Sequence, residues 1–239
     1  MVDFMTELLC LNDSYMKEFS AKITAIEGKS IVLDKTAFYP QGGGQPSDVG
    51  KILFNGKEHK VISVKKAGAN VLHELDSIDG LHVGAVVHGV IDWHCRYKLM
   101  RFHTSAHILA AVIFRETGKL ITGNQLDETY SRMDFDVENY SQEFLKGLEE
   151  KTNAEIAKNH EIAISYMPRE EALKVPELVR LKDIMPPAIS VWRIVKIGDL
   201  DIQADGGTHV KNTSEIGKIH ITKTENKGKS NRRVYWELI

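Results

Sequence analysis

The sequence is short of the residues that cross-link a chain or carry it through a membrane. Its 239 residues include only two cysteines, Cys10 and Cys95, which provide neither a disulfide framework nor a Cys-rich zinc motif. Such low cysteine use is typical of a reducing compartment. No apolar run approaches membrane-spanning length, and the N-terminus lacks the basic segment and apolar core of a secretory signal. We therefore expect a cytoplasmic protein with no membrane partner.

An excess of charge of either sign is also lacking. The formal net charge is −2, which argues against a generally basic nucleic-acid binder but leaves room for a local basic face. With 42% apolar and 27% charged residues, the chain has the composition of a folded protein rather than a disordered one. Its length suits one large domain or two modest ones.

Residues 20–92 carry the signals of short β-strands joined by turns. The stretch AKITAIEGKSIVLDK holds two alternating, β-branched runs around a glycine. In KILFNGKEHKVISV, the pair Asn55-Gly56 is a strong signal for a two-residue hairpin turn. Several short strands at this spacing predict a small barrel or sandwich. We assign an N-terminal β-barrel domain to residues 1–92.

The hydrophobic period changes at Trp93. From there to Gly118, apolar residues recur at helical spacing, and the glycine stands where a helix should end. The inward face of this helix is predicted to hold Leu99, Phe102, Ala106, Leu109 and Ile113. A second helix is predicted with Asn139 as its N-cap, and strands are predicted in RMDFDV, AISYMP, ISVWRIVKIG, GKIHITKTEN and NRRVYWELI. The fold class is therefore α+β, with an α/β two-layer domain over residues 93–239.

Two histidines lie four residues apart in the first helix, in the stretch RFHTSAHIL. At this spacing the imidazoles of His103 and His107 share one helix face and can share a metal ion. A pair of buried core histidines explains the helix equally well, because both lie beside the apolar stripe. No Glu follows His103, so the stretch is not the H-E-x-x-H protease motif.

The stretch ADGGTHV changes that balance. Its Gly-Gly pair permits a sharp turn, so Asp205 and His209 can converge on one point. Two helix ligands with one or two from this turn would make a three- or four-ligand site, which favours zinc. The plainer alternative is a turn in which Asp205 caps a backbone N–H, and it leaves His209 without a role.

A glycine-rich loop and a basic segment complete the candidates. AFYPQGGGQPSDVG can bring its backbone close to phosphate or sugar, but it lacks the Lys-Ser/Thr of a P-loop, so no nucleotide triphosphate is assigned. Residues 209–233 carry seven Lys or Arg against two acids, which suits a polyanionic partner. The alternative for the glycine-rich stretch is a loop that only connects strands. The alternative for the basic segment is a solvated hairpin.

Taken together and in this order, these stretches resemble the alanyl-tRNA editing family, which includes the editing domain of alanyl-tRNA synthetase and the free-standing AlaX proteins. FYPQGGGQPSDVG is similar to the family's Gly-rich loop, HTSAHIL to its H-x-x-x-H helix, and QADGGTHVKNTSEIG to its CGGTHV segment. KGKSNRRVYWEL resembles the basic strand that closes the domain. A barrel before the metal domain is similar to the medium-length AlaX form.

The resemblance implies an ATP-independent hydrolase that uses one zinc ion to release serine, with glycine as a second candidate, from mischarged tRNA(Ala). A hydrophobic alanine pocket cannot strongly reject an analogue that only adds a hydroxyl, and a second hydrolytic site is the usual remedy. The implied zinc ligands are His103, His107 and His209. Gly42, Gly43, Gly44 and Gln45 would lie near the pocket, with Gln45 a catalytic candidate. Thr122 and Asn124 would recognise the serine hydroxyl, and tRNA contacts would come from Lys227, Lys229, Arg232 and Arg233.

Asp205 departs from the family pattern, because it occupies the position of a cysteine ligand. A carboxylate oxygen is a legitimate zinc ligand, but loss of the thiolate loosens the preference for zinc over harder divalent ions. Asp205 is therefore expected either to bind the metal, to orient His209, or to hold a water molecule at the metal. Loss of metal and activity is a further alternative, which the three remaining histidines argue against.

Two rival functions stay open. One is metal-dependent editing of another mischarged tRNA, since threonyl-tRNA synthetases carry a similar domain. The other is a non-catalytic tRNA-binding module with a decayed site. The sequence allows a monomer or a dimer.

Overall fold

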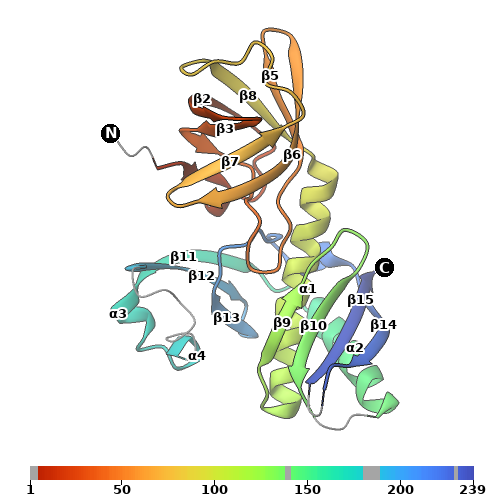
Figure 1. The fold of residues 1–239 in the computed structure, drawn as a ribbon. Helices are drawn as coiled ribbons and strands as arrows, with labels where there is room; N and C mark the ends of the chain where they lie inside the picture. Colours follow the sequence, from red (N-terminus) through yellow and green to blue (C-terminus); the bar gives the residue numbers. More distant parts are fainter. Residues whose placement is uncertain (1–4, 138–140, 180–188, 229–230) are drawn as a thin grey trace. The chain divides into compact units, whose positions relative to one another are not determined.

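A computed structural model describes residues 5–137, 141–179, 189–228 and 231–239. The chain divides into two compact units, Met1–Met100 and Arg101–Ile239, which are described separately below (Figure 1). Among the described residues, no helix is long and apolar enough to cross a membrane. The division of the chain into domains at residue 92 stays a prediction.

The first unit contains a closed six-stranded barrel with the order β2-β3-β7-β6-β5-β8. Its strands are β2 (Glu18–Glu27), β3 (Ser30–Leu33), β5 (Gly50–Phe54), β6 (Lys57–Ala67), β7 (Asn70–Leu75) and β8 (Val86–Ile91). Two short strands, β1 (Glu7–Leu8) and β4 (Lys35–Thr36), form a parallel pair beside it, and η1 (Leu9–Leu11) is a 3-10 turn. The predicted small barrel is confirmed.

Local sequence signals set the register of this barrel. Asn55 and Gly56 both adopt left-handed backbone conformations, with φ of 48° and 75°, and join β5 to β6 in the predicted hairpin. Alternate residues point inward along the strands, which is why the core is made of branched and aromatic side chains. Its fully buried members include Ile23, Ile31, Leu33, Phe38, Ile52 and Leu75.

The glycine-rich loop of this unit is a tight turn held by a buried ion pair. Gly42 and Gln45 exchange two backbone hydrogen bonds of 2.9 and 3.1 Å, while Gly43 and Gly44 have φ of 59° and 84°. Only glycine adopts two successive conformations of this kind readily. Further along, Asp48 accepts from the Tyr39 backbone N–H and from the Nε of the fully buried Arg96, the latter at 2.9 Å. The loop is thereby fixed to the first turn of α1 (Trp93–Thr117).

The second unit contains a four-stranded antiparallel sheet with the order β14-β15-β10-β9, which lies against α2 and residues 101–117 of α1 (Figure 1). The bounds are β9 (Ile121–Gln125), β10 (Ser131–Asp136), α2 (Gln142–Ile156), β14 (Ile219–Asn226) and β15 (Asn231–Leu238). Trp236 is fully buried and donates from its indole to Ser105 Oγ on α1 at 3.0 Å. The five inward positions predicted for α1 are all buried.

The second unit also contains a three-stranded sheet with the order β11-β12-β13. It comprises β11 (Ile162–Pro168), β12 (Val191–Ile197) and β13 (Asp201–Ala204), accompanied by α3 (Arg169–Ala172), α4 (Pro176–Val179) and η2 (Thr213–Ile216). Neither β9 nor β13 was expected from the sequence.

Two ends of the predicted helices can be compared with the structure. α1 ends as predicted at Gly118, which has φ of 69° and donates to the Phe114 carbonyl at 2.7 Å. The N-cap of α2 is Ser141, whose hydroxyl accepts from the Phe144 N–H at 3.1 Å. The prediction of Asn139 as N-cap was wrong by two residues, because a serine with the required geometry stands closer to the helix; Asn139 itself lies outside the described residues.

Candidate metal centre

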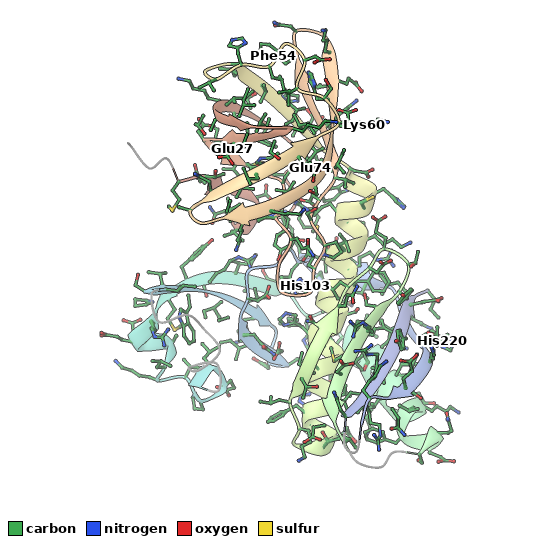
Figure 2. The ribbon with its side chains drawn as sticks, in the orientation of Figure 1. Glu27, Phe54, Lys60, Glu74, His103 and His220 are labelled. Atoms are coloured by element: carbon green, nitrogen blue, oxygen red, sulfur yellow. The ribbon has the colours of Figure 1, made fainter. Side chains whose placement is uncertain are left out.

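Four side chains of the second unit converge in a single buried cluster. They are His103 and His107 from α1, and Asp205 and His209 from the segment that follows β13. One potential ligand atom from each lies within 4.8 Å of the others. The three imidazole centroids are separated by 4.5 to 5.3 Å, and Figure 2 shows His103 projecting from α1. The structure therefore brings together the four residues that the sequence proposed as metal ligands.

The local backbone explains how two distant segments meet. His103 and His107 lie one helical turn apart on the same face, as their spacing predicts. In the turn, Asp205 Oδ2 accepts from the Gly207 backbone N–H at 2.6 Å, and this bond closes the Gly-Gly bend before His209. Gly207 also lies directly beside the His103 ring: a Cβ added there would come closer than 3.0 Å to two ring atoms. Glycine at this position is thus a packing requirement.

Hydrogen bonds away from the cluster orient two of the imidazoles. His107 Nδ1 lies 2.9 Å from Asp201 Oδ2, which leaves Nε2 for the cluster. His209 Nδ1 lies 3.2 Å from the Thr104 hydroxyl, and its Nε2 lies 3.0 Å from Asp205 Oδ2. Ring orientation of this kind, fixed through the outer nitrogen, is what metal-ligating histidines normally show.

Burial controls the charge of the cluster. It lowers the pKa of His103 well below 6.5, and Asp205 only partly opposes this effect. It likewise lowers the pKa of His209 to about 4, against the hydrogen bond and charge of Asp205. Burial also lowers the pKa of His107, but the hydrogen bond and charge of Asp201 outweigh it, so that pKa is raised. At neutral pH, His103 and His209 are therefore uncharged, and each keeps one unprotonated ring nitrogen.

Asp205 is the anionic member of the cluster. Burial alone raises the pKa of its carboxyl group. The surrounding imidazoles, led by His103 and His209, lower that pKa by a larger amount, so it lies well below 3.8. Arg193 of β12 adds a buried cation: its Nη1 donates to the Asp205 carbonyl at 2.7 Å and lies 3.9 Å from Oδ2. The Asp205 side chain remains 19% exposed, whereas His209 is fully buried, so the cluster opens to solvent on the Asp205 side.

The donor set matches the coordination chemistry of a divalent transition metal. Three imidazole nitrogens and one carboxylate oxygen are donors that zinc accepts in four-coordinate sites. His103, the more deeply buried ligand from the helix, is 2% exposed, and a polar ring buried to this extent needs a hydrogen-bonding or metal partner. The geometry thus fits a metal ion, while the chemistry of the donors leaves several divalent ions possible.

Comparison with known proteins places the chain in a family. The alanyl-tRNA editing protein AlaX-M of Saccharolobus solfataricus is 47% identical over 236 residues, which cover 98% of this chain and 99% of that protein. The AlaX-M protein of Methanosarcina mazei is 44% identical over 98% of this chain and 97% of its own length. The chain belongs to the AlaX family of alanyl-tRNA editing proteins. The resemblance noted from the sequence is therefore confirmed.

Matches to aminoacyl-tRNA synthetases support the same family assignment. The alanine–tRNA ligase of Thermococcus kodakarensis is 38% identical over 92% of this chain, which corresponds to 24% of the ligase. Residues 192–235 match the second additional domain of threonyl and alanyl tRNA synthetases, and residues 4–95 match class II (A) tRNA synthetases. The first of these matches contains Asp205 and His209, which places half of the cluster inside the shared domain.

Other residues proposed from the sequence lie in different surroundings. Thr122 and Asn124 are both on β9. Asn124 is paired with a residue of β10, whereas Thr122 falls at a register shift between the two strands. Thr122 is exposed and donates to Asn231 Oδ1 at 3.2 Å, whereas Asn124 is half-buried and lies opposite the buried Met133. Gln45 is buried in the first unit, whereas Gly43 and Gly44 of its turn are exposed. Their proposed roles stay predictions.

Part of the basic segment is paired with acidic neighbours. Arg233 forms two hydrogen bonds of 2.6 and 2.8 Å with Asp134, and Lys227 lies 2.9 Å from Glu225. Arg232 is buried and donates to backbone carbonyls. Lys229 lies outside the described residues. Contact of these side chains with tRNA stays a prediction that would require rearranged ion pairs.

Three residues that the sequence did not single out belong to the site: Asp201, Thr104 and Arg193. Each is polar and buried. An ionisable side chain inside an apolar strand is a signal that could have identified Arg193, which lies in the predicted strand ISVWRIVKIG. Asp201 had no such signal, because strand β13 was not predicted. A cavity of about 670 Å³ adjoins Asp201 and Gln203, and the four cluster residues are not part of its lining.

Proposed function

We propose that the chain is a metal-dependent hydrolase that releases serine from mischarged tRNA(Ala), with glycine as a second candidate. Membership of the alanyl-tRNA editing family supports the reaction class. The observation that carries the metal requirement is the convergence of three imidazoles and one carboxylate within 4.8 Å. In this proposal the second unit is the α/β two-layer editing domain and tRNA(Ala) is the partner.

His103, His107, His209 and Asp205 would hold the ion, zinc being the first candidate. A divalent ion there supplies Lewis acidity, which can polarise an ester carbonyl or acidify a water molecule. The chain's own contribution is geometric: Asp201 and Thr104 orient two rings, and burial keeps two imidazoles neutral. The open side of the cluster, at Asp205, is where the aminoacyl ester would approach.

Selection of serine over alanine requires a group that hydrogen-bonds the substrate hydroxyl. A site built for such a bond discriminates far more strongly than a purely apolar pocket, because its polar group is left unpaired with the wrong substrate. Thr122 and Asn124 are our candidates. Gln45 and the turn Gly42–Gly44 are proposed to contact the substrate, and Lys227, Lys229, Arg232 and Arg233 to contact tRNA.

The proposal is tested by measuring serine release from Ser-tRNA(Ala), with Ala-tRNA(Ala) for comparison, using native and metal-stripped protein. We expect fast, serine-selective release that disappears on stripping and returns when zinc is added. Release that survives stripping would refute the metal requirement while keeping the editing function. No release by the native protein would favour a binding module with a decayed site.

Substitution of a cluster histidine sharpens this test. His103→Ala should abolish hydrolysis without weakening tRNA binding, whereas His220→Ala, at an exposed histidine of β14 in the same unit (Figure 2), should change neither. Equal loss in both variants would show that the assay reports general damage.

A second candidate substrate follows from the comparison itself. The matched domain occurs in threonyl as well as alanyl tRNA synthetases, so the same cluster is compatible with editing of another mischarged tRNA. Deacylation measured side by side on mischarged tRNA(Ala) and tRNA(Thr) separates the two. The AlaX-M relatives, which match over nearly the whole chain, favour tRNA(Ala).

A further inference from the structure

The carboxylate of Asp201 is buried where the surrounding strand would ordinarily place an apolar side chain. Asp201 begins β13 directly after the turn that follows β12, and its side chain is only 4% exposed. Burial of a carboxylate is unfavourable unless charged or hydrogen-bonding partners compensate it. Two such partners are within reach: His107 Nδ1 lies 2.9 Å from Oδ2, and Gln203 Nε2 donates to Oδ1 at 3.2 Å.

These two contacts leave the carboxylate little freedom to rotate. The amide of Gln203 holds one oxygen, so the other is presented to His107 in a fixed direction. An ionised carboxylate only accepts hydrogen bonds, and the imidazole must therefore carry its proton on Nδ1. The lone pair of the neutral ring is then on Nε2, the nitrogen that faces His103, His209 and Asp205.

We propose that Asp201 is a positioning residue of the metal centre, which fixes the tautomer and the ring orientation of His107 so that Nε2 is available to the ion. The contact spans 94 residues of sequence, from α1 to β13. It therefore also ties the helix that supplies two ligands to the strand that leads into the Asp205 turn. The inference rests on the metal site of the proposed function but is independent of the substrate.

The first test is made on the metal-free protein. Nitrogen-15 NMR of labelled histidine distinguishes the two neutral tautomers, so the spectra are recorded at a pH above the raised pKa of His107. There, wild-type His107 should show the form protonated at Nδ1. Asp201→Ala should lose this preference, whereas Asp201→Asn should retain it, because the amide oxygen can still accept from Nδ1. Protonation of wild-type His107 at Nε2 would overturn the proposal, whatever the variants do.

The second test measures metal affinity with Zn²⁺ or Co²⁺ by chelator competition. Loss of an outer hydrogen-bond partner of a ligating histidine typically weakens binding 10- to 100-fold, and we expect this for Asp201→Ala, with a smaller loss for Asp201→Asn. The matched control is Asp199→Asn, which removes the same charge from the same turn at a fully exposed position. A folded Asp201→Ala protein with wild-type affinity would contradict the proposal, as would an equal loss in Asp199→Asn.

This test separates the inference from the proposed function. If Ser-tRNA(Ala) is not hydrolysed but the tautomer and the affinity behave as expected, the positioning role stands and the editing function fails. If hydrolysis is normal and the affinity of the folded Asp201→Ala protein is unchanged, the editing function stands and the positioning role is refuted. Circular dichroism and denaturation of each variant verify that it is folded.

Discussion

The close approach of Gly207 to His103 gives a sharp test of the cluster geometry. A Cβ at residue 207 would stand closer than 3.0 Å to Cε1 and Nδ1 of His103 and 3.1 Å from Asp205 Oδ2. The neighbouring Gly206 has open space at the same point, with no atom within 4 Å. Neither glycine lies in the left-handed region, so alanine at either position meets no backbone penalty, and the two substitutions differ only in the space available.

Gly207→Ala must therefore displace the His103 ring or the turn that carries Asp205. Forcing extra atoms into a packed interior costs about 1–3 kcal/mol, so the free energy of unfolding of the metal-free protein should fall by an amount in that range. Because the displaced group is a ligand itself, metal affinity should fall by at least the 10- to 100-fold expected for loss of an outer hydrogen bond. Gly206→Ala should leave both quantities near their wild-type values.

Urea denaturation of the metal-free proteins and chelator competition with Zn²⁺ measure the two effects separately. A Gly207→Ala protein that keeps wild-type stability and wild-type zinc affinity would refute the geometry, since no room exists for its methyl group in the structure. Equal damage in Gly206→Ala would show that the Gly-Gly pair is needed for flexibility rather than for space.

Three further perturbations test other parts of the structure. Arg96→Met should destabilise the first unit by about 3–5 kcal/mol in urea denaturation, because it leaves Asp48 buried without its cation. The double variant Arg96→Met, Asp48→Leu should recover part of this loss. Additive losses in the double variant would contradict a stabilising interaction between Arg96 and Asp48. Burial lowers the pKa of His73 from 6.5 to about 4, so the unfolded chain binds a proton that the folded one rejects, and stability should be lost as pH falls from 6.5 towards 4. At pH 5 the loss is about 2 kcal/mol relative to neutral pH; a His73→Gln protein should lack this component, and identical pH profiles would exclude it. Both cysteines lie in the first unit, and the metal cluster contains neither of them. Alkylation with iodoacetamide should therefore leave the metal content of the wild-type protein unchanged, whereas the metal content of Asp205→Cys should fall. Metal loss from the alkylated wild-type protein would contradict a centre without thiol ligands.

Much of the fold was predictable because its signals are local. The turn at Asn55-Gly56 and the helical period that ends at Gly118 both depend on residues a few positions apart. The three histidines and Asp205 were also visible, since each stands in a short stretch with its own spacing. That these two stretches meet was implied by the family resemblance and not by their spacing, because the meeting depends on the packing of α1 against the segment after β13.

Contacts between distant residues account for what was missed. The role of Asp201 depends on His107, 94 residues away, and nothing near Asp201 in the sequence indicates that its carboxylate is buried. In the same way, the count of basic residues near the C-terminus could not reveal that Asp134, 99 residues from Arg233, neutralises one of them. Composition reports the charges of a segment, whereas their availability depends on partners supplied by other elements.

The geometry of Asp205 reconciles two interpretations that the sequence set against each other. A capping aspartate needs one oxygen for a backbone N–H, and a metal donor needs one oxygen directed at the ion. The Asp205 carboxylate has both: Oδ2 accepts from Gly207 N–H at 2.6 Å, and Oδ1 lies 3.6 Å from His103 Nε2 at the cluster. A thiolate would carry the same negative charge on a single sulfur atom, whereas the carboxylate divides the two contacts between two oxygens. Arg193, held against the same residue, further restrains the carboxylate. Asp205 thus gives the centre a negative charge and gives the turn a hydrogen-bond acceptor through the same side chain.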